Sequence, residues 1–387
     1  MILCVDFGST FTKAALVDEH SGELLAATSH GTTIPDHRGR GDVLDGLEAC
    51  RTELARTHPG VRDAEVLACS SAGGGLRIAV VGSEELVTTE AGRRVALSSG
   101  GKVVAVLSRA SEDASYRCLQ HTSRPDVVLL TGGTDGGDED GILLGARRVA
   151  ASGWRGPVVV AGNSTAGAQA AALLGGFPVV LADNVVPRIG VLEPESARRA
   201  IRGMFLTHVI GGKHLSRRAD FTAMVRGATP DLVLTGVEVL AAETGDNGVV
   251  VVDIGGATTD VHSVVRLDPE DAGLSREVVA STPVTRTVEG DLGMRWSALS
   301  TWEAGLASGL VEEDLLPAAV RRAREPSLLP ATDAERHEDQ QLAAAAATLA
   351  LRRHAGRSRV VVGPDGRVVE RTGKDLRQVD LLVGSGG

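Results

Sequence analysis

The sequence predicts an α/β protein with two related halves, and three observations carry this prediction. Short apolar strands alternate with Ala-rich helices over residues 125–210, as they do in parallel sheets. The stretch DFGSTFTKAALVD at 6–18 returns, altered, as DIGGATTDVHSVV at 253–265. A second echo relates PDVVLLTGG at 125–133 to VDLLVGSGG at 379–387. Two different motifs that recur in the same order indicate a duplication.

The spacing of these motifs supports the same conclusion. In each copy of the first motif an Asp, a Gly and a Thr stand at offsets 0, 2 and 6; they are Asp6, Gly8 and Thr12, then Asp253, Gly255 and Thr259. The two motifs are 120 residues apart in one half and 127 in the other. We therefore predict a first lobe over 1–247, with insertions, and a second lobe over 248–387.

Each remaining element is predicted from its local pattern. Both copies of the first motif predict a hairpin, with two strands around a glycine turn. A polar, helix-prone stretch over 301–354 and a hairpin around Asp365-Gly366 follow later. The sequence then stops at Gly387, on the second glycine loop. If the halves match, a strand and one or more helices are missing there, so we expect the second lobe to be incomplete at its C-terminus.

Composition and charge limit the function classes. The chain has 387 residues and 43% hydrophobic content, which suits a globular protein of two domains. A net charge of −10 and an aromatic content of 2% disfavour nucleic-acid binding. The four cysteines lack CxxC spacing, so neither a zinc site nor an iron–sulfur cluster is expected. No stretch has the length of a signal peptide or membrane span, so we expect a soluble, cytoplasmic protein without membrane contact.

The first glycine turn has the chemistry of a phosphate site. A glycine turn exposes backbone N–H groups, which can cradle phosphate oxygens together with nearby hydroxyl groups. The groups available here are Gly8, the hydroxyls of Ser9, Thr10 and Thr12, and the positive charge of Lys13. Asp6, at the end of the preceding strand, can hold Mg²⁺, which prefers one or two carboxylates together with substrate phosphates.

The second turn repeats this arrangement with one change of charge. Its phosphate-binding candidates are Gly255, Gly256, Thr258 and Thr259. Asp253 is the second metal candidate, and Asp260 replaces the lysine of the first loop. One loop can then neutralise phosphate while the other holds metal or orients water. Two such loops facing each other would bind one magnesium triphosphate and act by positioning and electrostatics.

Other glycine-rich stretches leave alternatives open. In RTVEGDLGMR (286–295), Glu289 and Asp291 could reach the nucleotide or metal, or could start a helix. GGTDGG (132–137) could face a ligand or form a strand-to-helix turn. AGGG (72–75) receives no role. Neither a Walker A sequence nor a Rossmann turn is present, because Gly8 leads into a strand and not into a helix.

DxGSTxTK, DxGGxTTD and the late GSGG loop together resemble the actin–Hsp70–sugar kinase superfamily. The segments DFGSTFTKAALVD, LLTGGTDGG, VVLADNVVP, LVLTGVEVLA, VVVDIGGATTDVHSV and RTVEGDLGMR, in this order, resemble the MutL family that is associated with glutamate mutase. The resemblance spans nearly the whole chain. It implies two duplicated, actin-like (ribonuclease H-like) lobes with a nucleotide cleft between them.

The resemblance also implies a function. Members of that family are thought to reactivate adenosylcobalamin-dependent aminomutases such as glutamate mutase by a chaperone-like, ATP-dependent exchange of damaged cobalamin. By position, Asp253, Asp260 and Glu289 are the catalytic candidates, Asp6 and Asp253 would hold Mg²⁺, and Gly384, Gly386 and Gly387 would begin the adenosine loop. The expected partner is therefore a mutase, and the expected cofactors are ATP and Mg²⁺.

Three other functions compete with this one. A small-molecule kinase of the same superfamily needs a carboxylate base, for which Asp135 and Asp183 are the candidates. An actin-like scaffold would need interlobe contact surfaces that the sequence does not reveal. An iron–sulfur activator of a radical dehydratase fails on cysteine spacing.

Overall fold

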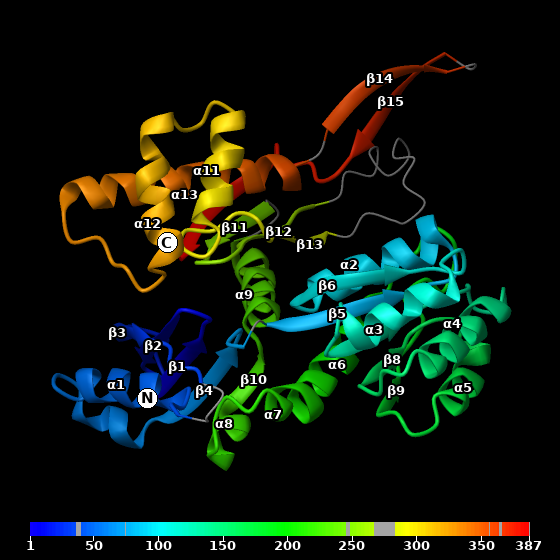
Figure 1. The fold of residues 1–387 in the computed structure, drawn as a ribbon, viewed down its shortest axis with the longest axis horizontal. Coiled ribbons are helices and arrows are strands. Elements are labelled where there is room, and N and C mark those ends of the chain that lie inside the picture. The colour runs from blue at the N-terminus through cyan, green and yellow to red at the C-terminus, as the bar shows by residue number, and fades with distance from the viewer. Residues whose placement is uncertain are drawn as a thin grey trace. The chain divides into compact units, whose positions relative to one another are not determined.

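The structure is a computed structural model that describes residues 1–35, 40–73, 75–244, 248–266, 283–355, 357–363 and 366–386 (Figure 1). The chain divides into two compact units, Met1–Leu232 and Val233–Gly387. Helix α9 (Thr229–Thr244) begins in the first unit and continues into the second. The predicted lobe boundary at 247/248 places the whole of this helix in the first lobe. None of the described helices is long and apolar enough to cross a membrane.

The first sheet of unit 1 contains the first predicted hairpin. Its strand order is β10-β4-β1-β2-β3. The strands are β1 (Ile2–Phe7), β2 (Phe11–Val17), β3 (Leu24–Gly31), β4 (Glu65–Ser70) and β10 (Val225–Ala228). β1, β2 and β3 are antiparallel neighbours, whereas β4 lies parallel to β1 and β10 lies parallel to β4. Leu3, Val5 and Phe7 alternate along β1 and are buried, as the period of a strand requires. Helix α1 (Leu44–Leu54) packs on β2 and β3.

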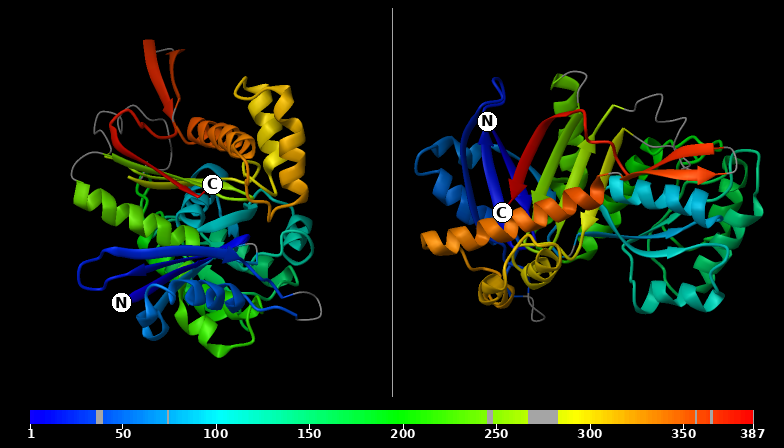
Figure 2. Two further views of the ribbon diagram at one scale, coloured as in Figure 1. Left: turned by 90° about the vertical axis from the view of Figure 1, so that its left-hand side faces the viewer. Right: turned by 90° about the horizontal axis from the view of Figure 1, so that it is seen from above.

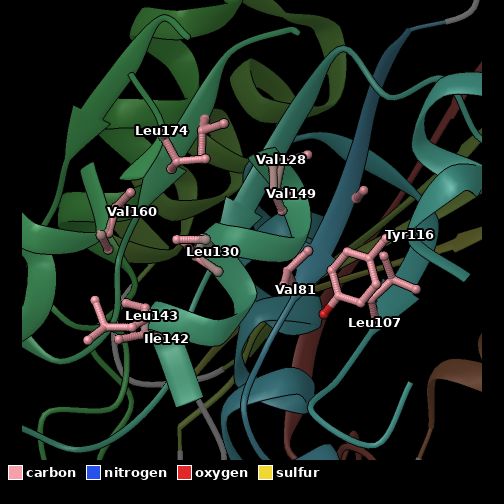
Figure 3. Close-up of a cluster of buried hydrophobic side chains, with 14 of the residues drawn as sticks. Val81, Leu107, Tyr116, Val128, Leu130, Ile142, Leu143, Val149, Val160 and Leu174 are labelled. Carbon is pink, nitrogen blue, oxygen red and sulfur yellow. The ribbon is translucent and has the colours of Figure 1, made fainter. Parts of the chain in front are cut away.

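Between β4 and β10 the chain builds a second sheet. All five strands are parallel, in the order β6-β5-β7-β8-β9. They are β5 (Leu76–Val81), β6 (Gly101–Leu107), β7 (Val127–Leu130), β8 (Val158–Val160) and β9 (Val179–Leu181). The accompanying helices are α2 (Glu90–Ser98), α3 (Cys118–His121), α4 (Asp140–Ala151) and α5 (Ser164–Leu173). Val128, Leu130, Ile142, Val149 and Val160 form part of the core between sheet and helices (Figure 3). The predicted parallel α/β arrangement of this stretch is confirmed.

This sheet corrects the predicted match between PDVVLLTGG and VDLLVGSGG. PDVVLLTGG contains β7, which lies in the inserted parallel sheet and pairs with β5 and β8. The strand beside β1 is β4, and the AGGG stretch follows it. In unit 2 the strand parallel to β11 (Gly248–Ile254) is β16 (Val379–Gly386), which carries VDLLVGSGG. The counterpart of VDLLVGSGG is therefore the β4 stretch. Both candidates are strands with apolar residues that glycines follow within a few positions, so the sequence pattern alone does not separate them.

The remaining helical elements of unit 1 precede β10. They are α6 (Glu195–Met204), a π-helical turn (Phe205–Val209), α7 (Ile210–Gly212) and α8 (Ala219–Met224). Ala197, Ile201 and Met204 are buried at helical spacing on α6. A helix therefore ends the predicted α/β stretch over 125–210, with its last part wound as the π-helical turn.

Unit 2 contains a four-stranded sheet in the order β13-β12-β11-β16. The other strands are β12 (Thr259–Val264) and β13 (Val284–Glu289), and the helices are α11 (Ala298–Ala307), α12 (Leu316–Arg324) and α13 (Asp333–His354). α13 packs on β11 and β12, where Val250, Val252 and Val261 meet Ala346 and Leu349 (Figure 2). Val249 and Val251 point the other way, toward Val237 and Ala241 of α9. Both predicted features of this region, the second hairpin and the helical stretch over 301–354, are confirmed.

The start of α13 and the strands after it follow from local sequence. Thr332 and Glu335 form a capping box, in which each side chain accepts a hydrogen bond from the other residue's backbone N–H. After α13 the chain forms the predicted hairpin of β14 (Arg357–Gly363) and β15 (Gly366–Thr372), which pair with each other. Figure 1 shows this two-stranded ribbon extending away from the sheet and helices of unit 2.

The sheets that contain the two glycine turns share one pattern. β3-β2-β1-β4 and β13-β12-β11-β16 each consist of three antiparallel strands followed by one parallel strand. In both cases the first motif of the sequence lies on the two inner strands of this series.

Candidate functional site

The first glycine turn joins β1 to β2. The Gly8 N–H donates to the Phe11 carbonyl at 3.1 Å and closes the turn. A Cβ atom at Gly8 would lie 2.6 Å from that oxygen, so the position has no room for a side chain. Ser9 is exposed, and the Thr10 hydroxyl is buried without a hydrogen-bond partner among the described residues.

The second turn, between β11 and β12, closes in the same way. The Gly255 N–H donates to the Thr258 carbonyl at 2.8 Å. A Cβ atom at Gly255 would lie 2.9 Å from the same oxygen. Gly256 and Thr258 are half-buried. The shared glycine of the sequence motif is therefore explained by one backbone contact that both turns make.

Each turn is held by a different neighbouring segment. In unit 1, the N–H groups of Ser71 and Ala72 donate to the Phe7 carbonyl at 3.0 and 2.9 Å. In unit 2, the N–H groups of Met294 and Arg295 donate to the carbonyls of Gly255 and Gly256 at 3.0 and 2.8 Å. The Gly-Met-Arg part of RTVEGDLGMR therefore supports the second turn through its backbone.

The two threonines at the matching offset do not face a phosphate, and that prediction is corrected. Thr12 is fully buried, its hydroxyl lies 3.1 Å from that of Thr32, and it fills the space beside Gly46 of α1. Thr259 is fully buried as well, and its hydroxyl donates to the Leu292 carbonyl at 3.0 Å. Both residues tie a hairpin to its neighbouring segment, which explains why the same residue type recurs.

Asp6 lies at the end of β1 and is held by side chains from two other elements. The Thr229 hydroxyl donates to Asp6 Oδ1 at 2.7 Å, and the Cys69 thiol donates to the same oxygen at 3.5 Å. Burial, together with the negative charge of Asp6, raises the pKa of the Cys69 thiol far above its usual value. Lys13 stands opposite Asp6 in the hairpin register and is exposed.

Asp253 occupies the equivalent place in unit 2, but its register partner is Asp260. Asp260 is buried and accepts a hydrogen bond from Arg286 at 3.0 Å. Burial raises the pKa of Asp260 against the opposing effect of Arg286, and the nearby charge of Asp253 acts in the same direction as burial. Asp260 therefore belongs to a buried ion pair beneath the turn, and Asp253 is the half-buried carboxylate at its end.

Glu289 and Asp291 both bind Arg353, the next-to-last residue of α13. Arg353 donates to Glu289 at 2.7 Å and makes two hydrogen bonds to Asp291, at 2.7 and 2.9 Å. These hydrogen bonds lower the pKa of Asp291. Neither carboxylate starts a helix, because β13 ends at Glu289 and α11 begins at Ala298. The Arg353 contacts give Glu289 a role in joining β13 to α13.

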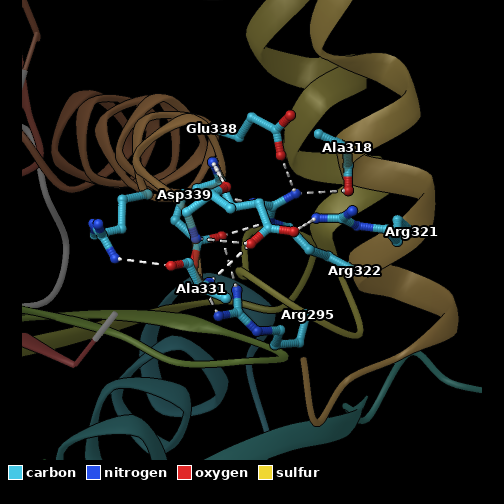
Figure 4. A network of polar contacts seen from close by, with 10 residues as sticks. Arg295, Ala318, Arg321, Arg322, Ala331, Glu338 and Asp339 are labelled. Atoms are coloured by element: carbon cyan, nitrogen blue, oxygen red, sulfur yellow. Dashed lines mark hydrogen bonds and ion pairs between the residues drawn. The ribbon is translucent and has the colours of Figure 1, made fainter. Parts of the chain in front are cut away.

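A buried arginine network connects the second turn to the helices of unit 2 (Figure 4). Arg295, whose backbone holds Gly256, forms an ion pair with Asp339 of α13 at 3.0 Å. Arg322 of α12 is fully buried, and it contacts Asp339 and, at 2.9 Å, Glu338. Buried charges are stable only when they are paired and hydrogen-bonded, as these are. The ion pairs connect the segment that supports the second turn to α12 and α13.

The late glycines lie in a strand. β16 extends through Gly384 to Gly386, and Gly386 stands opposite Ile254 in the register. Gly386 has a φ of 83°, and a Cβ atom there would lie 2.2 Å from the Ile254 carbonyl. These two exposed glycines lie in the strand that pairs with β11, and their part in an adenosine loop stays a prediction. Gly387 lies outside the described residues.

The inserted sheet contains the kinase candidates and GGTDGG. The Asp135 carboxylate accepts hydrogen bonds from the Ser164 N–H at 2.9 Å and the Asn184 side chain at 3.0 Å. Burial acts to raise the pKa of Asp135, but these hydrogen bonds prevail and lower it. Asp135 therefore accepts the first N–H of α5, beside the N-cap Asn163, and links the glycine loop to this helix, while Asp183 is exposed after β9. GGTDGG forms a strand-to-helix connection between β7 and α4, the second of its two predicted alternatives.

Sequence reasoning missed Thr229, Cys69 and the support from Gly293 to Ser297. Thr229 and Cys69 are far from Asp6 in the sequence, and no spacing rule relates them to it. The one available signal is Thr-Pro-Asp at 229–231, which is typical of a helix start that follows a strand.

The fold and the two turns define an α/β protein with two glycine turns of the same construction, each placed beside a strand-end carboxylate. A family model described as "MutL protein" matches residues 2–387. "Protein MutL" of Clostridium tetanomorphum is 35% identical over 399 residues, which cover 100% of this chain and 85% of that protein. The chain belongs to the MutL protein family, as its resemblance predicted.

Among solved structures, the chain is similar to the nucleotide-free structure of an acetone carboxylase that was solved to study ATP-dependent acetone carboxylation. The alignment covers 90% of this chain and 61% of the carboxylase chain. Its sequence identity is 15% and its TM-score is 0.37. This chain thus spans about three fifths of the length of that structure.

Proposed function

We propose that this protein binds and hydrolyses Mg-ATP and uses that cycle to reactivate an adenosylcobalamin-dependent aminomutase such as glutamate mutase. The observation that carries the nucleotide part is the repeated construction of the two turns. In both, a glycine N–H closes on the carbonyl three residues later, and a strand-end Asp stands two residues before that glycine. The wider proposal of two duplicated, actin-like lobes is supported by the shared strand pattern of the two sheets.

The residues at the first turn fit a phosphate group bound with Mg²⁺. Glycine turns of this kind expose backbone N–H groups that can bind phosphate oxygens, and the turn keeps its shape only with glycine at position 8, where a Cβ atom would meet the Phe11 carbonyl. The exposed Ser9 and Lys13 offer a hydroxyl and a positive charge, and the Thr10 hydroxyl has no partner among the described residues. Asp6 offers a carboxylate of the kind that Mg²⁺ takes alongside phosphate oxygens.

In this proposal the residues divide into four roles. Ser9, Thr10 and Lys13 in the first turn, and Gly256 and Thr258 in the second, bind phosphate oxygens through backbone N–H groups, hydroxyls and charge. Gly8 and Gly255 shape the two turns, since their own N–H groups close them. Asp6 and Asp253 orient the metal or the attacking water, and bound Mg²⁺ would neutralise developing negative charge. Asp260 and Glu289 act indirectly, since Arg286 and Arg353 occupy them.

The mutase partner and the cytoplasmic location rest on the family. The family match and the MutL relative support a role beside glutamate mutase. The proposed product is a mutase freed of damaged cobalamin, with ATP binding and hydrolysis changing the affinity of this protein for its partner.

The test measures ATP hydrolysis by the purified protein with and without an inactivated, cobalamin-loaded glutamate mutase. We expect turnover without any added hydroxyl substrate, a several-fold increase with the inactivated mutase, and recovery of mutase activity when intact adenosylcobalamin is added. Hydrolysis without any effect of the mutase would reject the reactivation role and leave an ATPase. Absence of nucleotide binding by calorimetry would reject the whole proposal.

A further inference from the structure

We propose that Thr229 is a positioning residue that fixes the carboxylate of Asp6 in the first glycine turn. This inference rests on the proposed function, because it assigns Asp6 to the metal–phosphate site. The geometry behind it lies within unit 1 and does not depend on the ligand.

Asp6 is oriented from two sides through one oxygen. Thr229 Oγ1 donates to Asp6 Oδ1 at 2.7 Å, and Cys69 Sγ donates to the same atom at 3.5 Å. The short hydrogen bond from the hydroxyl is the stronger contact, since thiols are weak donors and hydrogen bonds to a charged group are the strong ones. Thr229 is therefore the stronger of these two donors to the carboxylate.

The position of Thr229 is itself fixed. It is the first residue of α9 and follows β10 directly, and β10 pairs with β4, the strand that carries Cys69. Two residues further on, Asp231 is buried and forms a two-pronged ion pair with Arg202 of α6. Pro230 stands between them, where its fixed φ suits the first turn of a helix. A donor that directly follows a sheet strand, at the start of a helix anchored by a buried ion pair, holds its acceptor with little freedom.

Three variants separate positioning from folding. Thr229→Val keeps the shape of the side chain and removes the hydroxyl, and Thr229→Ser restores the hydroxyl. Thr244→Val is the matched control, because Thr244 lies at the other end of α9 and its hydroxyl donates to helix carbonyls at Leu240 and Ala241.

The first measurement is the affinity for Mg-ATP by calorimetry. We expect Thr229→Val to weaken binding about tenfold, the effect of losing one hydrogen bond to a charged group. Thr229→Ser should restore most of the affinity, and Thr244→Val should match the parent protein. A folded Thr229→Val protein with unchanged Mg-ATP affinity would overturn the proposal.

The second measurement needs no nucleotide. Crystal structures of the parent and Thr229→Val proteins without ligand report directly on the orientation of the Asp6 carboxylate. If Thr229 holds Asp6 there, the carboxylate should turn away from its parent position in Thr229→Val and keep that position in Thr229→Ser. An unchanged carboxylate orientation in Thr229→Val would contradict the positioning role. A turned carboxylate in Thr229→Val, together with a parent protein that binds no Mg-ATP, would retain the positioning role and reject the proposed function.

Discussion

The two glycine turns use one backbone design with opposite charge arrangements around it. Opposite Asp6 the hairpin register places exposed Lys13, whereas opposite Asp253 it places buried Asp260, neutralised by Arg286. Asp6 is held by Thr229 and Cys69, whereas no described donor contacts the Asp253 carboxylate. The repeated motif therefore preserves the backbone of the turn, whereas the side chains around the turn differ between the two copies. We infer a fixed anchor in the first turn and an adjustable carboxylate in the second.

Replacing Asp253 should have the largest effect. We expect Asp253→Ala to lower the ATP hydrolysis rate by about 10³-fold, the range found for a group that orients the attacking nucleophile. Asp314→Ala, which removes an exposed carboxylate before α12, is the control and should retain full activity. Steady-state phosphate release is the measurement, and normal turnover by Asp253→Ala would refute the role of this residue.

A double-mutant cycle sharpens the same prediction. If Asp6 and Asp253 act on one ligand, their Asn variants should be non-additive in Mg-ATP affinity. Strictly additive changes in the free energy of Mg-ATP binding would show that Asp6 and Asp253 do not act on the same ligand.

The register partners should differ in their effect on stability. Asp260→Ala leaves Arg286 buried without its carboxylate, so we expect a loss of about 3 kcal/mol in the free energy of unfolding. Lys13→Ala removes an exposed charge and should change stability by less than about 0.5 kcal/mol. Urea unfolding of both variants measures the two losses in the free energy of unfolding. Equal losses would contradict the difference in burial between Lys13 and Asp260.

Acid should destabilise unit 2 through His354. This residue is buried and lies within 3.0 Å of Thr287 and 2.8 Å of Ser263. Burial, helped by the charge of Lys374, lowers the pKa of His354 to about 4. The unfolded chain therefore binds the proton more readily, so this stability is present above about pH 6.5 and is lost as pH falls toward 4.

The expected loss is on the order of 2 kcal/mol between pH 6.5 and 5. Hydrogen exchange, which reports on each unit separately, is the measurement. His354→Gln should reduce the pH dependence in unit 2 but not abolish it, because burial also lowers the pKa of His262 in β12. His337→Gln, at an exposed position of α13, should leave it unchanged. An equally steep profile in His354→Gln would assign the acid sensitivity to another group.

The smallest effect tests the shared turn. Gly8→Ala and Gly255→Ala place a methyl group 2.6 and 2.9 Å from a carbonyl oxygen, so we expect losses of about 1–2 kcal/mol in stability and weaker Mg-ATP binding. Gly31→Ala is the control, since a Cβ atom there meets nothing within 4 Å. If thermal unfolding shows that Gly8→Ala and Gly255→Ala lose no more stability than Gly31→Ala, the two turns do not depend on the contact that they share.

The sequence predicted well what depends on local pattern. Both hairpins, the parallel α/β stretch and the helices after residue 298 follow from periods of two and 3.6 residues and from turn glycines. It failed where a residue's role depends on distant neighbours. Thr12 and Thr259 have the chemistry of phosphate ligands, but helix α1 and the Leu292 segment bury them. Thr229 was missed because only the fold brings it to Asp6.

The second echo shows the same limit at the level of strands. β4 and β7 are both strands with apolar residues, and glycines follow each of them within a few positions. No residue within either stretch determines which sheet the strand joins. The choice is made by pairing with β1 or with β5, which is a long-range property.

The inserted parallel sheet has a consequence for how unit 1 folds. The chain leaves the first sheet at Ser70 and returns to lie beside the same strand only at Val225. Closing so long an excursion before any of it is ordered costs chain entropy, and that cost falls if the excursion collapses first and brings its ends together. On the ribosome, β1, β2, β3 and β4 emerge early but must wait for their last neighbour. A paused synthesis product ending near residue 190 should therefore protect the interior of the insertion from proteolysis while β4 still has an open edge.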